Sequence, residues 1–383
     1  MLEKVSHTPE LARQYMQKRK LPLQLRALSL FAVPALFVVC GASDFVSSYS
    51  LVFTRNLYFS AAVVWTALYA AMFVAGLPIS ILQYRVDRTF DLARGDPKRR
   101  LIDAAKANGI AFLFGLAVVE TVFITMNLPG EYTWLLAAFG VSVIYAALVY
   151  VIPELMPLFY RMTPVTNQQL SLKLTALAHR AGVEFAEVYE WHISSRTRRA
   201  NAAVAGFGKA RKVILTDTLV QHFSEDEIEA LIAHEFGHCA HNHILKRVLL
   251  RTALFVPVLW AVQGAILYRL VLGADGGWSN PAVVSAFWCL WLLLTIYGNL
   301  VMAAVARRQE RAADRFSWEQ IPSVLPFISA MNKFTAVNLV AYDKSSEWKY
   351  THPATPERIA AAQKFARDRG QSPQVEASAA VIA

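Results

Sequence analysis

Long apolar runs alternate with polar stretches along this chain of 383 residues. A helix that crosses a membrane needs about 20 predominantly apolar residues. Six segments fit that requirement: 27–46, 57–83, 109–128, 132–159, 248–272 and 282–306. Pro34 and Asp44 interrupt the first, which is the weakest of the six. The pattern therefore predicts four membrane spans within residues 27–160, two more within 248–306, and polar segments at 1–26, 161–247 and 307–383.

The composition supports a membrane protein. Hydrophobic residues make up 55% of the chain and charged residues only 17%, whereas soluble domains carry about a quarter of their residues as charges. The net charge of +10 could suggest nucleic-acid binding. However, the basic residues flank the apolar runs instead of alternating with aromatic residues, so we expect no nucleic-acid partner. The three cysteines show no spacing typical of a disulfide framework or a thiolate metal site.

The basic residues also predict the orientation of the chain. Loop 84–108 carries seven lysines and arginines, whereas loops 47–56, 129–131 and 273–281 carry only Arg55 between them. Loops rich in lysine and arginine stay in the cytoplasm. We therefore expect the N-terminus, the insert between spans four and five, and the C-terminal part to be cytoplasmic. A helix-start signal at Thr8-Pro9-Glu10 predicts that the N-terminus 1–26 is not a cleaved signal and that its residues 8–26 form an amphipathic surface helix leading into the first span. Residues 366–383 are predicted to form a flexible tail.

The polar insert 161–247 has the pattern of a small α+β domain. Leucines and alanines at helical spacing predict a helix over 165–182. Short strand-like runs follow at 185–193, 202–207 and 211–216. Ser224 precedes Glu227 by three residues, a capping box that starts another helix. That helix continues into the motif His234-Glu235-Phe236-Gly237-His238.

This motif predicts a metal site. His234 and His238 are four residues apart and share one face of the helix, which is the H-E-x-x-H arrangement of zinc peptidases, whose glutamate is the general base. We therefore expect one catalytic zinc ion, with Glu235 as the base. A catalytic zinc needs a third protein ligand. Glu310 is the leading candidate because it directly follows the sixth span; if spans five and six pack antiparallel, Glu310 meets the zinc helix.

Other interpretations of these polar residues stay open. Glu310 and Asp314 could form a solvated charged face just past a membrane helix. Three further histidines could compete as ligands, and we interpret them as residues at the rim of the site: His222, His241 and His243. Glu120 lies in the middle of the third predicted span. It is either a functional residue or a residue without such a role, which pairs with another group inside the bundle or faces a water-filled cavity.

Together, these motifs resemble the M48 zinc metallopeptidases, and among them the Ste24-like CaaX prenyl proteases. The resemblance covers roughly 165–365. Besides the zinc helix and the Glu310-x-x-x-Asp314 pair, it rests on the segments Ser195–Leu219, Thr351-His352-Pro353 and Pro356-Glu357-Arg358-Ile359. It implies a mainly α, polytopic membrane bundle that encloses a chamber, with a small gluzincin-like α+β cytoplasmic peptidase domain.

The resemblance also implies roles for individual residues. His234, His238 and Glu310 would be the zinc ligands, and Glu235 the base. Asp314 would support a ligand or donate a proton, His352 would steady the oxyanion, and Arg358 would orient the site. Asn201, Ala202 and Ala203 would form an edge strand that pairs with an extended substrate. The chain departs from the family at Ala203, where an aromatic residue is usual, at His192, where an acidic residue is usual, and in having six spans instead of seven. These departures concern substrate choice and leave the metal site intact.

The function expected from the sequence is hydrolysis of peptide bonds by zinc-activated water. The substrates would be peptides or proteins, which can be prenylated. The enzyme would be embedded in membrane lipid. Its compact arrangement of six spans favours a bacterial cytoplasmic membrane. One alternative is a broad-specificity endopeptidase for membrane-protein quality control. Another is a non-enzymatic membrane chaperone or scaffold. A protease that cuts within membrane spans is disfavoured, because the acidic segment 224–229 places the zinc helix outside them.

Overall fold

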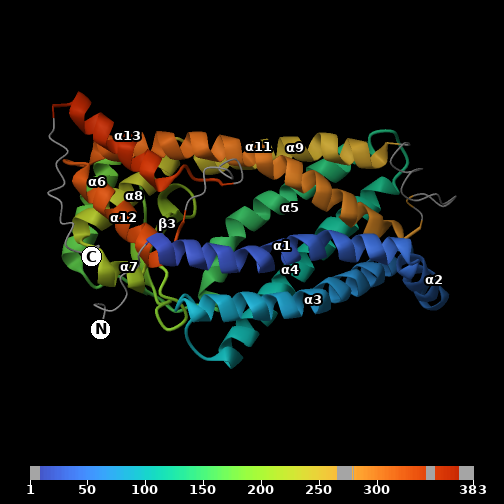
Figure 1. The fold of residues 1–383 in the computed structure, drawn as a ribbon. Helices are drawn as coiled ribbons and strands as arrows, with labels where there is room; N and C mark the ends of the chain where they lie inside the picture. The colour runs from blue at the N-terminus through green and yellow to red at the C-terminus, as the bar shows by residue number, and fades with distance from the viewer. Residues whose placement is uncertain (1–8, 265–277, 279, 342–349, 371–383) are drawn as a thin grey trace.

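The computed structural model describes residues 9–264, 278, 280–341 and 350–370. Long helices form an extended bundle, and a compact part that contains the sheet lies at one end of it (Figure 1). The bundle is built from α1 (Pro9–Val39), α2 (Ala42–Thr54), α3 (Leu57–Thr89), α4 (Pro97–Met126), α5 (Thr133–Leu155), the short 3-10 helix η1 (Met156–Leu158), α9 (His243–Gln263) and α11 (Val283–Gln320).

Five of these helices are long and apolar enough to cross a membrane: Pro9–Val39, Leu57–Thr89, Pro97–Met126, Thr133–Leu158 and Val283–Gln320. They correspond to predicted spans one to four and six. The predicted fifth span, 248–272, is seen as α9 up to Gln263, and its residues 265–272 lie outside the described part of the chain. α9 is not among the five; its first three turns carry Lys246, Arg247 and Arg251.

The first predicted span has the wrong bounds. Residues 9–26 and 27–39 belong to one continuous helix, α1, with Pro22 and Pro34 inside it. The surface helix predicted over residues 8–26 is therefore, from Pro9 onward, the first part of α1 and not an element of its own, and residues 1–8 lie outside the described part. The helix ends at Val39 because Gly41 adopts a left-handed conformation, with φ +75°, and the chain turns into α2. Residues 42–46, predicted to end the first span, begin that second helix.

The compact end contains a four-stranded sheet with the order β1-β2-β4-β3. Its strands are β1 (Met162–Pro164), β2 (Glu187–Trp191), β3 (Ala202–Ala205) and β4 (Lys212–Thr216). β2 and β4 are parallel, and both outer pairs are antiparallel. The three strands predicted from the sequence are therefore present with shorter bounds. The sequence pattern did not indicate β1, which has only three residues.

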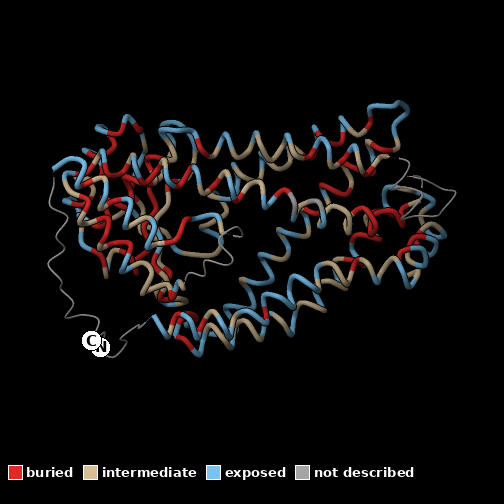
Figure 2. Tube along the Cα trace, turned by 45° about the horizontal axis from the view of Figure 1, so that its top comes forward, coloured by how far each residue is buried: buried red, intermediate tan, exposed pale blue. Residues whose placement is uncertain are grey.

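Helices cover the sheet and form the core of the compact end. They are α6 (Gln168–Ala181), α7 (Asp217–His222), α8 (Glu225–Ala240), α12 (Leu325–Asn338) and α13 (Thr355–Asp368), besides the 3-10 helix η2 (Gly208–Ala210). α8 is central, since it packs against α6, α11, α12 and β3. Buried residues concentrate at this end, whereas intermediate and exposed residues predominate along the long helices (Figure 2). Of the predicted flexible tail, 366–368 belong to α13 and 371–383 lie outside the described part.

Candidate metal centre

The helix that carries His234 and His238 begins where the capping box predicted. The Ser224 hydroxyl accepts from the Glu227 backbone N–H at 3.3 Å, and the Glu227 carboxylate accepts from the Ser224 N–H at 2.7 Å. The same carboxylate accepts from Ser329 and Lys333 of α12. Burial would raise the pKa of Glu227, but these donors outweigh it and lower the pKa. The start of α8 is therefore fixed both locally and to a neighbouring helix.

The second element of the site is α11, which continues without a break from the sixth predicted span to Gln320. It packs closely on α8 at Gly237. A Cβ placed on Gly237 would lie 2.9 Å from the Ala313 Cα and 3.1 Å from the Ala313 carbonyl oxygen. Only glycine permits this approach. α9 also packs against both α11 and α8. The close packing of α11 on α8 places Glu310 next to His234 and His238.

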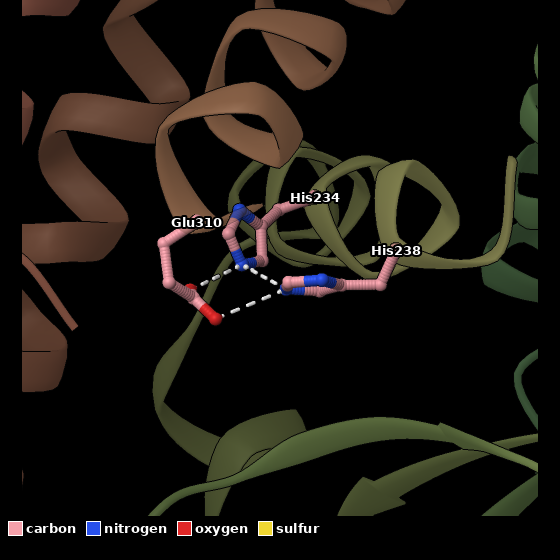
Figure 3. A group of neighbouring side chains, drawn as sticks. All are labelled: His234, His238 and Glu310. Atoms are coloured by element: carbon pink, nitrogen blue, oxygen red, sulfur yellow. Dashed lines mark hydrogen bonds and ion pairs between the residues drawn. The ribbon is translucent and has the colours of Figure 1, made fainter. Parts of the chain in front are cut away.

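Three side chains converge between these helices. The Nε2 atoms of His234 and His238 are 3.2 Å apart, and the Glu310 carboxylate oxygens lie 3.2 Å from His234 Nε2 and 3.3 Å from His238 Nε2. His234 and His238 project from one helix and Glu310 from another toward a common point (Figure 3). Among the described residues, this is the group of histidine, cysteine and acidic side chains able to hold a metal ion. Two imidazoles and one carboxylate form a donor set typical of catalytic zinc.

A second layer of contacts fixes His234. Asp314 Oδ1 lies 2.8 Å from His234 Nδ1, and Arg358 of α13 binds the Asp314 carboxylate through two hydrogen bonds, of 2.6 and 2.8 Å. Burial would lower the pKa of His234, but its hydrogen bonds with Asp314 and Glu310 raise it to about 9 in the metal-free protein. Burial alone would lower the pKa of Arg358, but the negative charge of Asp314 outweighs burial, so the pKa of Arg358 is raised.

Glu235 and His352 lie beside this cluster. Glu235 follows His234 on α8 and is half-buried, and its charge contributes to the raised pKa of Arg358. His352 Nδ1 lies 2.8 Å from Glu310 Oε2, while 63% of the His352 side chain is exposed. The structure thus connects through short contacts six of the predicted residues: His234, His238, Glu310, Asp314, His352 and Arg358. Glu235 is placed next to them by its position on α8. The catalytic roles expected of these residues stay predictions.

Residues 201–203 lie at the edge of the sheet, as predicted. β3 is an outer strand, and Ala203 is paired with Ile214 of β4. Asn201 is exposed, and its N–H donates to the Thr216 hydroxyl at 2.9 Å. In the described part of the chain no strand pairs with the outer edge of β3. Backbone groups on that edge can therefore pair with an extended peptide.

Two residues near the ligands were not predicted. His243 was interpreted as a rim residue, and this is wrong: only 4% of it is exposed, and its Nδ1 lies 2.9 Å from His238 Nδ1. Arg247 Nη2 lies 3.3 Å from Glu310 Oε1. A spacing of five residues does not place His238 and His243 on one face of a helix. They meet because α8 ends at Ala240 and the chain turns through Asn242, at φ +52°, into α9.

The other two histidines are not part of the group formed by His234, His238 and Glu310. The ring of the exposed His241 makes a hydrogen bond from Nδ1 to the Gly237 carbonyl oxygen. His222 is the last residue of α7. Glu120 lies on α4, where one of its carboxylate oxygens has no hydrogen-bond partner among the described residues. Its role stays a prediction.

Comparison with known proteins places this geometry in a family. Residues 164–366 match the description of peptidase family M48, and residues 10–161 match that of the CAAX prenyl protease N-terminal region with five membrane helices. The latter range contains α1 to α5, of which α2, with 13 residues, is shorter than a span.

Relatives match along most of the chain. CAAX prenyl protease 1 of Saccharomyces cerevisiae is 24% identical over 309 residues, which cover 74% of this chain and 68% of that protein. The human CAAX prenyl protease 1 homolog is 22% identical, with 84% and 76% covered. The metalloprotease YhfN of Bacillus subtilis is 26% identical, with 75% and 70% covered.

A solved structure shares the fold. The crystal structure of Saccharomyces mikatae Ste24p aligns with a TM-score of 0.79 at 20% identity, covering 92% of this chain and 88% of the other. The predicted fold class, a membrane helical bundle around a chamber with a small α+β peptidase domain, agrees with that match.

Proposed function

Since the chain belongs to peptidase family M48, in its Ste24-like branch, and is a metalloprotease of the membrane, we propose that it is a zinc endopeptidase whose substrates include prenylated, CaaX-type peptides. The observation that supports the metal most directly is the convergence of His234 Nε2, His238 Nε2 and the Glu310 carboxylate between α8 and α11. The names of the relatives support the substrate class.

The residues present fit zinc. The three donors lie within 4.8 Å of one another, and only 1% of Glu310 and 6% of His234 is exposed. A zinc ion held by these residues supplies Lewis acidity, which polarises a carbonyl group and lowers the pKa of water to about 7. Asp314 accepts the Nδ1–H of His234 and so fixes the tautomer that leaves the Nε2 lone pair facing the other two donors. Arg358 holds Asp314 in place for that task.

The remaining steps fall to side chains of the chain itself. Glu235 takes a proton from the attacking water and passes it to the leaving amine, the usual role of the glutamate in this motif. His352 donates a hydrogen bond to the developing oxyanion, an interaction worth roughly 3 kcal/mol by comparison with other such donors. The exposure of the His352 side chain supports this role, because its ring is accessible to a substrate.

The substrate would bind as an added strand along the outer edge of β3. Asn201 is exposed there, and Ala202 and Ala203 present only methyl groups, so a peptide backbone can approach closely. The side chain of Asn338 supports the start of this strand, because it accepts from the Ala200 N–H at 3.0 Å and donates to the Ala200 carbonyl at 3.1 Å.

We further propose that the N-terminus and the peptidase part face the cytoplasm of a bacterial cell. In the structure the predicted basic loop 84–108 consists of the end of α3, the connection 90–96 and the start of α4. It touches the peptidase part directly: the Arg94 N–H donates to the Arg196 carbonyl at 2.6 Å, and Arg196 forms an ion pair with Asp103 at 2.6 Å. Loop and peptidase part therefore lie on one side of the bundle. Because loops rich in basic residues stay in the cytoplasm, this contact supports a cytoplasmic active site.

Mass spectrometry of cleavage products tests the proposal. The detergent-purified protein is incubated with a peptide mixture that contains farnesylated members and matched unmodified ones, beside the Glu235→Ala variant and a chelator-treated sample. We expect cleavage of farnesylated peptides that disappears in both controls. Equal cleavage of unmodified peptides would contradict the prenyl preference and favour quality control. Cleavage that survives both controls, or zinc binding without any hydrolysis, would contradict the zinc-peptidase proposal.

A further inference from the structure

Each of the two histidine ligands has a second ring nitrogen that faces away from the other donors. For His234 this atom is Nδ1, which meets the carboxylate of Asp314 at 2.8 Å. For His238 it is also Nδ1, and its partner is the Nδ1 of His243 at 2.9 Å. The two ligands are therefore held by chemically different partners, a carboxylate for the first and an imidazole for the second.

We propose that His243 is the positioning residue for His238, an inference that rests on the proposed zinc site. To bind a metal through Nε2, His238 must carry its ring proton on Nδ1. Only one hydrogen can lie between the two Nδ1 atoms, so His243 Nδ1 is the acceptor. His243 is then neutral and carries its own proton on Nε2. This contact fixes both the tautomer and the ring orientation of His238.

A second metal ion between the two histidines is a weaker explanation of the short distance. It would need further ligands, and the group of described residues with suitable geometry is the one formed by His234, His238 and Glu310. Among the described residues, the neighbouring His241 is not part of a group with that geometry. A hydrogen bond accounts for the geometry of the pair without any additional component.

The fold holds the His243 ring in place. His243 is the first residue of α9 and is 4% exposed. Its ring meets the His238 ring at 68° with centroids 5.0 Å apart, and the ring of His241 stacks on its other side at 5.3 Å. His241 in turn packs edge-on against Phe316 of α11. The ring of His243 is thus held by the stacked ring of His241 and by the edge contact with His238.

The start of α9 also contacts a second ligand. Arg247 lies four residues after His243, on the same face of the helix, and its Nη2 approaches Glu310 Oε1 at 3.3 Å. Arg247 is held by a second hydrogen bond from its Nε to Gln309. Each proposed ligand therefore has a partner of its own. Asp314 of α11 contacts His234, while His243 and Arg247 of α9 contact His238 and Glu310. α9 belongs to the metal centre as much as α8 and α11 do.

Zinc affinity of the full-length protein, measured in detergent by competition with a chromogenic chelator, tests this role. The informative pair is His243→Leu and His243→Asn, because leucine and asparagine have nearly the same shape and only asparagine offers an acceptor near the position of Nδ1. Loss of an outer partner of a metal ligand weakens metal binding by roughly 10- to 100-fold. We expect that loss for His243→Leu and recovery of most of it for His243→Asn. His179→Leu, at an exposed histidine in the last turn of α6, is the matched control and should bind zinc like the wild type.

The melting temperature of the metal-free protein, recorded in chelator, separates positioning from simple packing. A purely structural role would lower this temperature and weaken zinc binding alike in both His243 variants, and that result would overturn the inference. So would a His243→Leu variant that binds zinc as tightly as the wild type. If His243→Leu does not fold, His243→Asp replaces it in the comparison, and its stronger acceptor must bind zinc at least as tightly as His243→Asn does.

Failure of the zinc site itself gives a different result. A wild-type protein that binds no zinc, or that keeps its zinc in the His234→Ala variant, would contradict the proposed function. If the His234→Ala variant loses zinc but the His243→Leu variant binds zinc as tightly as the wild type, the result would contradict only the role of His243.

Discussion

Replacing Gly237 with alanine should separate the two helices that carry the proposed metal ligands. The added Cβ would lie 2.9 Å from the Ala313 Cα, 3.1 Å from its carbonyl oxygen and 3.2 Å from its Cβ. Ordinary van der Waals contacts of a Cβ begin at 3.4 Å. Two of the three obstacles are backbone atoms, so no rotamer change can relieve the clash. α8 and α11 must therefore move apart by about half an ångström, and Gly237 immediately precedes His238.

The expected cost follows from two opposing effects. Overpacking of this kind destabilises proteins by about 1–3 kcal/mol, whereas replacing glycine with alanine within a helix contributes up to ~1 kcal/mol of stability. We expect a net loss of about 1–2 kcal/mol. The effect on catalysis should be larger, since a misplacement of 1 Å costs roughly 100-fold in rate. The displacement expected here corresponds to a loss of roughly 10-fold.

Thermal unfolding in detergent, zinc affinity and peptide hydrolysis together check this prediction. The matched control is Gly109→Ala on α4, where a Cβ would meet no atom within 4 Å and the same propensity gain applies without a clash. Gly109→Ala should be at least as stable as the wild type and equally active. If Gly237→Ala matched Gly109→Ala in melting temperature, zinc affinity and turnover, then the close packing of α8 on α11 would not determine the geometry of the site.

Three further substitutions test individual contacts. Glu235→Gln should lower peptide hydrolysis by roughly 10²- to 10⁴-fold without changing zinc affinity, and full activity in this variant would rule out Glu235 as the base. Arg358→Met removes the guanidinium that pairs with the buried Asp314 and leaves Asp314 only its contact with His234. Breaking a buried ion pair in this way should cost about 3–5 kcal/mol; an unchanged melting temperature would show that the pair is dispensable. Because the Lys333 and Ser329 hydrogen bonds lower the pKa of Glu227, Glu227 stabilises the fold above its unfolded pKa near 4.5, and this contribution is lost as the pH falls. Glu227→Gln should remove that part of the pH dependence of unfolding, and an unchanged pH profile would contradict it.

Patterns among residues that are close in the sequence predicted much of the fold and the main elements of the site. The capping box at Ser224 needs only four residues to be recognised, and the helix starts there. His234 and His238 share a face because of helical spacing alone. The proximity of Glu310 was a conditional prediction, since it required two membrane helices to pack together, and the structure fulfils that condition.

The features that could not be predicted depend on turns or on long-range contacts. The end of α1 is set by Gly41, where a left-handed backbone conformation breaks an otherwise apolar run. β1 has three residues and forms only because β2 offers an edge to pair with. His243 reaches His238 because the chain turns sharply at Asn242. Hydrophobic periodicity carries no information about turns or long-range contacts. It therefore could not show that His243 is buried.

The position of Glu310 links catalysis to the membrane bundle mechanically. α11 is one helix of 38 residues, apolar along its first part and carrying Glu310 and Asp314 near its end. No loop separates the apolar part of α11 from this proposed ligand, and α9, which carries His243, packs along the same helix. Any tilt or shift of these two helices must therefore move one ligand and the partners of all three. We accordingly expect zinc affinity to depend on the detergent or lipid that surrounds the bundle, whereas a soluble peptidase with ligands on loops would be insensitive to it.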